Sequence, residues 1–173
     1  MLHEVYTILR ELGTTAVFVT HDQEEAFMVA DRVGVLNQGR LEQLGCPEDI
    51  YHWPATRFVA RFVAKADFLP GLVTGAGIET EIGTFPNAAG FPGGAMLEVM
   101  IRPEQVELIP DPAGRAVVIS RRFRGADTLL VVQFPSGVIL HSHQPSTLML
   151  TPNARVKVAA RATRVVAFPA IQP

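Results

Sequence analysis

Several kinds of residue and pattern are scarce in this chain, and each scarcity excludes a class of protein. Cysteine occurs once, as Cys46, so no disulfide can form within the chain, which fits a reducing compartment. Fifteen Lys and Arg nearly balance seventeen Asp and Glu, so there is no basic excess of the kind that binds nucleic acid. No apolar run reaches the roughly twenty residues of a membrane helix, and no basic and apolar leader follows Met1. We therefore expect a cytoplasmic chain that reaches membranes only through protein partners.

The composition changes near Lys65. Before this point, apolar residues follow helix and strand periods in alternation, and after it Gly and Pro recur between short β-branched runs. The pattern predicts a mixed α+β chain in two parts. Residues 1–64 would be an α/β remnant, and residues 65–173 an all-β barrel of OB-like type.

Residues 1–64 resemble the end of a parallel α/β sheet. Apolar residues recur at helical spacing from Leu2 to Leu12, and Gly13 stands at the stop position. Residues 14–20 are a nearly continuous apolar and β-branched run, which predicts a parallel strand buried on both faces. Asp22 is expected to cap the next helix, in a capping box with Glu25. The predicted buried face of that helix comprises Ala26, Val29, Ala30 and Val33.

The rest of this part predicts a hairpin and two short helices. Strands are expected from Arg32 to Leu36 and from Arg40 to Leu44, about a turn at residues 37–39. Pro47 should open a helix that ends at Tyr51. Thr56 should cap a last helix, whose apolar side would carry Phe58, Val59, Phe62 and Val63.

A strand buried on both faces needs parallel neighbours and covering helices, and residues 1–64 offer too few of them. We therefore expect that Met1 lies inside a larger ancestral domain. The chain would be either a naturally shortened gene product or an engineered piece. On this reading Val17, Phe18 and Val19 should leave apolar surface exposed.

Short β-branched runs separated by turn residues fill residues 65–173, which is typical of a small barrel or sandwich. The predicted strands are Leu69–Thr74, Glu79–Ile82, Met96–Ile101, Ala116–Phe123, Thr128–Phe134, Val138–His141, Arg155–Ala160 and Val165–Phe168.

His21 is the sharpest candidate for chemistry. It follows the predicted buried strand and precedes a helix, and ligand sites in open α/β sheets lie off such strand ends. An imidazole there can donate a hydrogen bond to a phosphate oxygen. A lone histidine at a strand end also has a purely structural explanation, as a cap or packing residue.

The residues around His21 resemble the histidine-switch region of ABC transporter ATPases. The matching segments are residues 19–26, 30–33, 36–45, 47–51, Pro54 and 57–60, in the family's order and spacing over roughly the first third of the chain. The resemblance implies that His21 contacts the γ-phosphate of ATP and stabilises a closed, ATP-sandwiched dimer. It also implies ATP and Mg²⁺ in the complete protein, ABC permease subunits as partners, and a place on the inner face of the plasma membrane.

This chain lacks the other chemical parts of that family. It has no Gly-x-x-x-x-Gly-Lys-Ser/Thr phosphate loop, no Leu-Ser-Gly-Gly-Gln-like signature, and no apolar run ending in Asp-Glu. Those parts would supply the phosphate cradle, the magnesium ligand and the general base. We expect no ATPase activity from this chain alone.

The second part also contains a family pattern. Arg102-Pro103-Glu104, Phe123-Arg124-Gly125 and the run at residues 152–158 resemble the C-terminal OB-like (TOBE) regulatory domain of importer ATPases. The resemblance implies regulatory or interface roles for Arg102, Glu104 and Arg124. A surface ion pair of little energy explains Arg102 and Glu104 equally well. Residues 123–127 and 134–137 favour the ferric-iron branch, although polyamine, sulfate, maltose and phosphonate importers share most of these features.

The sequence is also compatible with other functions. A stand-alone OB-like module could bind a small oxyanion or metal through Arg102, Arg121, Arg122 and Arg124. Nucleic-acid binding ranks last, because the net charge is negative. Glu24 and Glu25 occupy consecutive helix positions that do not face each other. Cys46 has no catalytic neighbours, and His141 and His143 share a strand face but have no third metal ligand at a recognisable spacing.

Overall fold

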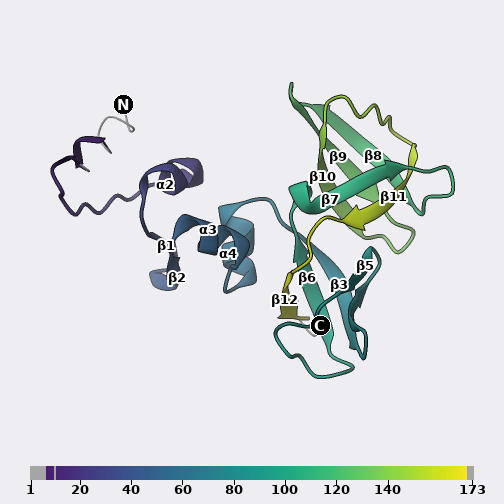
Figure 1. Ribbon diagram of the computed structural model, residues 1–173, viewed down its shortest axis with the longest axis horizontal. Coiled ribbons are helices and arrows are strands. Elements are labelled where there is room, and N and C mark those ends of the chain that lie inside the picture. The colour runs from purple at the N-terminus through teal and green to yellow at the C-terminus, as the bar shows by residue number, and fades with distance from the viewer. Residues whose placement is uncertain (1–6, 10, 171–173) are drawn as a thin grey trace. The chain divides into compact units, whose positions relative to one another are not determined.

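The computed structural model describes residues 7–9 and 11–170 (Figure 1). The chain divides into two compact units, Met1–Ala64 and Lys65–Pro173, and each is described by itself. Among the described residues, no helix has the combination of length and hydropathy that a bilayer crossing requires.

Unit 1 consists of short helices and one hairpin. Residues 7–9 and 11 are helical, and this turn ends where the Leu12 amide donates to the Ile8 carbonyl at 3.0 Å, just before Gly13 at φ 60°. The start of the helix predicted from Leu2 lies outside the described residues. The remaining elements are α2 (Gln23–Val29), β1 (Val33–Asn37), β2 (Arg40–Gly45), α3 (Pro47–His52) and α4 (Arg57–Val63).

Local sequence signals explain where these elements begin. The Asp22 carboxylate caps α2 by accepting hydrogen bonds from the amides of Glu24 and Glu25. The Thr56 hydroxyl caps α4 by accepting from the Val59 amide at 3.2 Å, as predicted. The β1–β2 turn places Gln38 and Gly39 at φ 48° and 77°, the two positive angles that a tight hairpin turn requires.

Four expectations for unit 1 are wrong, in whole or in part. Residues 14–20 form no strand, because a strand needs a neighbour to accept and donate its backbone hydrogen bonds, and the described chain provides none there. Helix α2 has no buried residue. The second half of the capping box is also missing, because the Asp22 amide donates to Thr20 instead of Glu25. In α4, Ala60 is buried and Phe62 is 42% exposed, stacked on Phe58.

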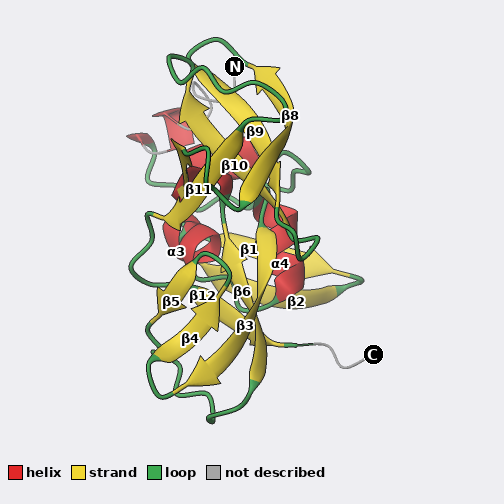
Figure 2. Ribbon diagram, turned by 90° about the vertical axis from the view of Figure 1, so that its right-hand side faces the viewer, coloured by secondary structure: helices red, strands yellow, loops and turns green. Residues whose placement is uncertain are grey.

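Unit 2 is almost entirely β-structure, as predicted. One sheet has the order β10-β9-β8-β11-β7, and the other has the order β12-β6-β3-β4-β5, with all pairs antiparallel (Figure 2). The strands are β3 (Asp67–Thr74), β4 (Gly77–Thr80), β5 (Gly83–Phe85), β6 (Met96–Ile101), β7 (Val106–Pro110), β8 (Ala116–Phe123), β9 (Asp127–Gln133), β10 (Ile139–Pro145), β11 (Arg155–Ala160) and β12 (Val166–Pro169), with a 3₁₀ turn η1 (Pro103–Gln105) between β6 and β7.

Alternation of side chains builds one core from both sheets. In β9 the exposure alternates along the strand, so that Thr128, Leu130 and Val132 point inward and are fully buried. The core joins residues of both sheets: Leu69, Val73, Ile78, Phe85, Leu97, Val99, Ile101, Val106, Leu108, Ala116, Val118, Leu130, Val132, Phe134, Leu140, Leu150 and Val156.

Buried polar side chains connect the two outer strands of the first sheet. Ser142 and Gln144 of β10 are both buried, and both donate to the carbonyl oxygen of Val106 at the start of β7, at 2.6 and 2.8 Å. These bonds satisfy a buried carbonyl that has no ladder partner on that side. They bring β10 against β7 and give unit 2 its OB-like, closed character.

Candidate functional site

His21 lies at an exposed corner of unit 1. The amide of Asp22 donates to the Thr20 hydroxyl at 2.9 Å, which folds residues 20–22 into a tight turn with His21 at its centre. The Thr20 hydroxyl in turn donates to the Glu25 carboxylate at 3.2 Å, so the turn is fastened to the first turn of α2. The imidazole is therefore presented to solvent by a defined local structure and is not walled into a core.

The chemistry that His21 can perform is narrow. Its ring N–H can donate to an anionic oxygen, but the neighbouring acids Asp22, Glu24 and Glu25 oppose a negative ligand. Asp22 is already committed to the α2 amides. An anion at this corner therefore needs amide or cationic donors from residues outside this turn. His21 can therefore supply one contact to a phosphate site that other residues form, but it does not form such a site by itself.

The described residues contain no group of three or more His, Cys, Asp or Glu side chains that could hold a metal ion. His141 and His143 do share one face of β10, because Ser142 between them is buried. Each histidine is engaged separately. The His141 ring lies 3.0 Å from the Asp67 carboxylate, and His143 lies between Asp127 and Arg124.

Arg102 lies inside unit 2. Its side chain is 1% exposed, and its Nη1 donates to the Lys65 carbonyl at 3.2 Å. The Arg102 amide donates to the Gln105 side chain at 2.9 Å, which closes the η1 turn. Glu104 is exposed on the same turn. Arg102 is therefore an interior residue, and its hydrogen bond to Lys65 ties the start of η1 to the start of the unit.

Arg124 is exposed at the β8–β9 turn. Its Nη1 lies 3.4 Å from Nε2 of His143, and the other ring nitrogen of His143 lies 3.9 Å from Asp127. Phe123 beside it is 64% exposed. The structure thus places Arg124 on the surface and Arg102 in the interior, and it does not bring the two together into one site. The expected interface role of Arg124 stays a prediction.

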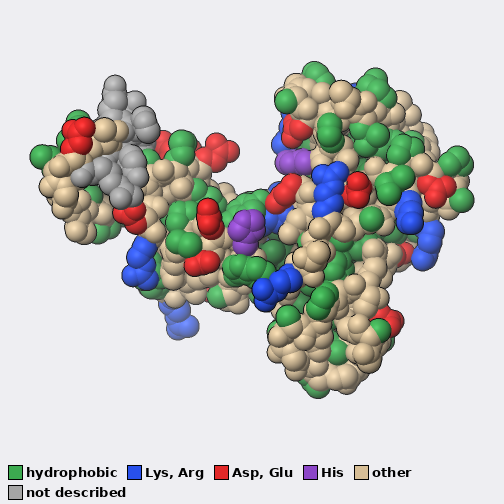
Figure 3. Space-filling view, in the orientation of Figure 1, with side chains coloured by type: hydrophobic (Ala, Val, Ile, Leu, Met, Phe, Trp, Pro, Cys, Tyr) green, Lys and Arg blue, Asp and Glu red, His purple; other side chains and the backbone are tan. Residues whose placement is uncertain are grey.

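Basic and acidic side chains are interspersed on the face of unit 2 seen in Figure 3. Arg121 and Arg122 lie at the end of β8 and Arg124 follows in the β8–β9 turn, but Asp127 lies just beyond them in the chain. The expectation that the chain does not bind nucleic acid stays a prediction.

The sequence analysis did not single out two acids that make contacts between the sheets, Asp67 and Glu81. Asp67 accepts from both the amide and the ring of His141, at 2.6 and 3.0 Å. Glu81, in the β4–β5 turn, accepts from Ser136 and from Arg115. Both acids bridge the two sheets across 34 to 74 positions of sequence, and no local pattern signals such a contact.

Comparison with known proteins assigns unit 2 to a domain class. Residues 99–168 match the family model of the TOBE domain. This match covers strands β6 to β12 in part or whole.

The curated relatives are import ATP-binding proteins. The chain is 40% identical over 149 residues to the spermidine/putrescine import ATP-binding protein of Marinobacter nauticus, covering 78% of the chain and 39% of that protein. It is 39% identical over 179 residues to a sulfate/thiosulfate import ATP-binding protein of Chromobacterium violaceum, covering 96% and 49%. It is 43% identical over 114 residues to an Fe(3+) ions import ATP-binding protein of Rhizobium meliloti, covering 64% and 28%.

Among solved structures, the cytoplasmic molybdate-binding protein ModG with molybdate bound is similar at 16% identity and a TM-score of 0.46, covering 58% of this chain and 94% of that one.

The chain belongs to the ATP-binding subunits of ABC importers and corresponds to their C-terminal part with the TOBE domain. It spans less than half the length of these relatives.

Proposed function

We propose that this chain supplies the C-terminal part of an ABC importer ATP-binding subunit. In this role, residues 1–64 are the last segment of the nucleotide-binding domain, and residues 65–173 are its regulatory β domain. The complete subunit would couple ATP binding and hydrolysis to solute uptake.

The segment before His21 carries this proposal. Val17, Phe18 and Val19 are 92%, 56% and 86% exposed, although their sequence is that of a strand buried on both faces. Large contiguous apolar exposure of this kind marks a surface that another structure covers. We expect strands of the nucleotide-binding domain to flank it. His21 would then stand at the carboxyl end of a central strand, where ligands of such sheets lie.

His21 has a single part in this function. Its N–H would donate to the terminal phosphate of ATP when the two subunits of a dimer close. The residues of this chain do not by themselves hold ATP or Mg²⁺, because the phosphate cradle and the magnesium ligands belong to motifs that the sequence lacks. Those groups would come from the rest of the subunit and from its dimer partner.

The same proposal fixes the partners and the place of action. The subunit would dock on ABC permease subunits at the cytoplasmic face of the membrane and would form a homodimer. Arg124 and Glu104, both exposed on unit 2, are the candidates for regulatory contacts. We propose ferric iron as the transported solute, on residues 123–127 and 134–137. The relatives named above are import proteins for spermidine/putrescine, sulfate/thiosulfate and Fe(3+) ions.

A chimera tests the proposal. The 173 residues replace the corresponding C-terminal part of the Marinobacter nauticus relative, and ATP hydrolysis is measured on the purified subunit and with its permease. We expect activity in the chimera and a loss of about 100-fold in His21→Ala, the usual effect of removing one phosphate or oxyanion donor. His52→Ala, also exposed in unit 1, is the matched control and should retain activity. Full hydrolysis by the His21→Ala chimera would contradict the proposed role.

A further inference from the structure

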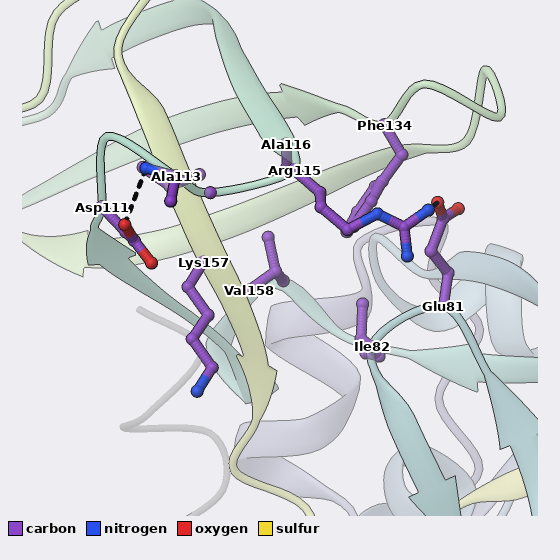
Figure 4. A pocket seen from close by; sticks show the side chains of 11 residues that line it. Glu81, Ile82, Asp111, Ala113, Arg115, Ala116, Phe134, Lys157 and Val158 are labelled. Atoms are coloured by element: carbon purple, nitrogen blue, oxygen red, sulfur yellow. Dashed lines mark hydrogen bonds and ion pairs between the residues drawn. The ribbon is translucent and has the colours of Figure 1, made fainter.

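Unit 2 has a cleft of about 360 Å³ between its two sheets, but the charges that line it are balanced (Figure 4). The lining includes two acids, Glu81 and Asp111, and two bases, Arg115 and Lys157. Arg115 donates to Glu81 at 3.4 Å, and Lys157 points away from Arg115. The side chains that line the cleft therefore have no excess of either charge that would select a ligand. The polar contacts that converge on one candidate group lie in unit 1, around His21.

The imidazole of His21 is exposed and has no hydrogen-bond or ion-pair partner among the residues that the structure describes. Its position is therefore set by the backbone that carries it and not by contacts of its own ring. A group that donates to a phosphate oxygen must be held within about 0.5 Å of its productive place. The residues that fix the backbone on either side of His21 therefore decide how well the imidazole can meet a phosphate.

The backbone after His21 is fixed by Asp22. The Asp22 carboxylate accepts from the amides of Glu24 and Glu25 at 2.9 and 3.1 Å. Its carbonyl oxygen accepts from the Ala26 amide at 3.2 Å. These are the N-cap contacts of α2, and they fix the chain on one side of His21 only.

The backbone before His21 is fixed by the side chain of Thr20, which is half-buried. Its hydroxyl oxygen accepts from the Asp22 amide at 2.9 Å, which closes a turn over His21. A hydroxyl also has one proton to donate, and here the proton goes to the Glu25 carboxylate at 3.2 Å. Because a carboxylate oxygen accepts, Glu25 fixes the direction of that proton and leaves a lone pair of the Thr20 oxygen for the Asp22 amide.

We propose that Thr20 and Glu25 are positioning residues for His21. Thr20 holds the backbone on the side of His21 that the helix cap does not reach, and Glu25 holds the hydroxyl of Thr20. The negative charge of Glu25 opposes direct contact with a phosphate, so both residues would act only through the imidazole. The inference rests on the proposed function of His21, because its position matters only where the imidazole meets a ligand.

ATP hydrolysis by the chimera with the Marinobacter nauticus relative tests the role of Thr20. Thr20→Val keeps the shape of the side chain but removes the hydroxyl, and it should lower kcat about tenfold, since a misplacement of 1 Å can cost about 100-fold. KM should change little, because other residues bind most of the ATP. Thr20→Ser keeps the hydroxyl and should restore most of the activity. In the His21→Ala background, Thr20→Val should cause no further loss, because a residue that acts through another is not additive with it.

The role of Glu25 needs a control for charge, because removing an acid near the site also strengthens the attraction of ATP. Glu25→Ala and Glu24→Ala remove the same charge from consecutive positions, but the Glu24 side chain has no contact among the described residues. Both variants should lower KM, and only Glu25→Ala should lower kcat, by about threefold, the effect of weakening one hydrogen bond. Glu25→Gln keeps an oxygen that accepts from Thr20 and should recover most of the lost kcat.

The purified chain gives a second readout that does not depend on activity. Thr20→Val and Glu25→Ala should speed hydrogen exchange of the Asp22 amide, whereas Glu24→Ala should not. Unchanged exchange in Thr20→Val would show that the hydroxyl does not fix the turn. Far-UV circular dichroism verifies the fold of each variant, and if Thr20→Val does not fold, the comparison of Glu25→Ala with Glu24→Ala decides.

The kinetic outcomes separate this inference from the proposed function. A slow His21→Ala chimera with full kcat in Thr20→Val would refute the positioning role alone. So would equal losses from Thr20→Val in the presence and absence of His21, or equal losses of kcat in Glu24→Ala and Glu25→Ala. Full hydrolysis by His21→Ala would refute the proposed function, and the positioning role would fail with it.

Discussion

Units 1 and 2 contain similar apolar runs, but the runs are buried in unit 2 and exposed in unit 1. In unit 2, Val99, Leu130 and Val132 lie in paired strands and are fully buried. In unit 1, Val17 and Val19 form part of an equally apolar run and are exposed. The core of unit 1 is small among the described residues and comprises Val35, Ile50, Val59 and Val63.

The difference lies in the neighbours and not in the runs themselves. A strand is stable when adjacent strands take its backbone hydrogen bonds and cover its side chains. Unit 2 supplies both within 109 residues, since Lys65–Pro173 contains all the strands of its two sheets. Residues 14–20 have neither among the parts of the chain that the structure describes. The same kind of apolar run therefore forms a strand only where neighbouring strands pair with it.

The largest expected effect comes from truncating one aliphatic side chain in each setting, a leucine in unit 2 and a valine in unit 1. Leu130→Ala should lower the free energy of unfolding of unit 2 by about 3 kcal/mol, because the fully buried side chain leaves a cavity. Val17→Ala should change the stability by less than about 0.5 kcal/mol, because the side chain is 92% exposed. Chemical denaturation followed by far-UV circular dichroism, which the strands of unit 2 dominate, measures both.

The aromatic residues provide a control for this comparison. Trp53 is the single tryptophan and lies in unit 1, so its fluorescence reports that unit alone. Leu130→Ala should leave the fluorescence transition unchanged. A Val17→Ala variant that loses as much stability as Leu130→Ala would show that the exposed segment is packed, and the contrast between the units would fall.

A smaller effect is expected where a polar contact joins the two sheets of unit 2. Asp67→Ala should destabilise the unit by about 2 kcal/mol, because the amide of His141 loses its acceptor in a half-buried place. Glu107→Ala is the control, since Glu107 and Arg161 form an exposed pair at 3.9 Å that should contribute less than about 0.5 kcal/mol. Equal losses in the two variants, measured by denaturant titration, would contradict a special role for Asp67.

Much of unit 2 could be predicted from its sequence. Strands Met96–Ile101, Ala116–Phe123 and Arg155–Ala160 have the bounds that their β-branched runs and flanking turns indicate. Strand β7 (Val106–Pro110) was missed, because it follows the η1 turn without a turn signal between them. Strand β5 (Gly83–Phe85) was missed because three residues are too short to show a period.

Some features of the candidate site follow from neighbouring residues, whereas others depend on contacts between residues far apart in the sequence. The position of His21 in a turn before a capped helix follows from neighbouring residues, namely Thr20 and Asp22. The burial of Arg102 depends on the Lys65 carbonyl, 37 positions away. The hydrogen bond from Ser136 to Glu81 spans 55 positions. Contacts of this length follow from the pairing of whole sheets, which local patterns do not encode.

The smallest effects should come from removing the two helix caps. The two substitutions test whether α4 is packed in the core of unit 1 while α2 is not. Thr56→Ala removes the cap of α4, whose Val59, Ala60 and Val63 are buried, so about 1 kcal/mol should be lost from the unfolding of unit 1. Asp22→Ala removes an equivalent cap from α2, which has no buried residue.

The loss of the Asp22 cap should therefore increase local opening of α2 without shifting the unfolding of unit 1. Amide hydrogen exchange at Glu25 and Val59, together with the fluorescence of Trp53, distinguishes the two cases. Asp22→Ala should speed exchange at Glu25 alone, whereas Thr56→Ala should speed exchange at Val59 and lower the fluorescence midpoint. A midpoint that falls equally in both variants would mean that α2 is part of the cooperative core of unit 1, and its open face would then need another explanation than missing neighbours.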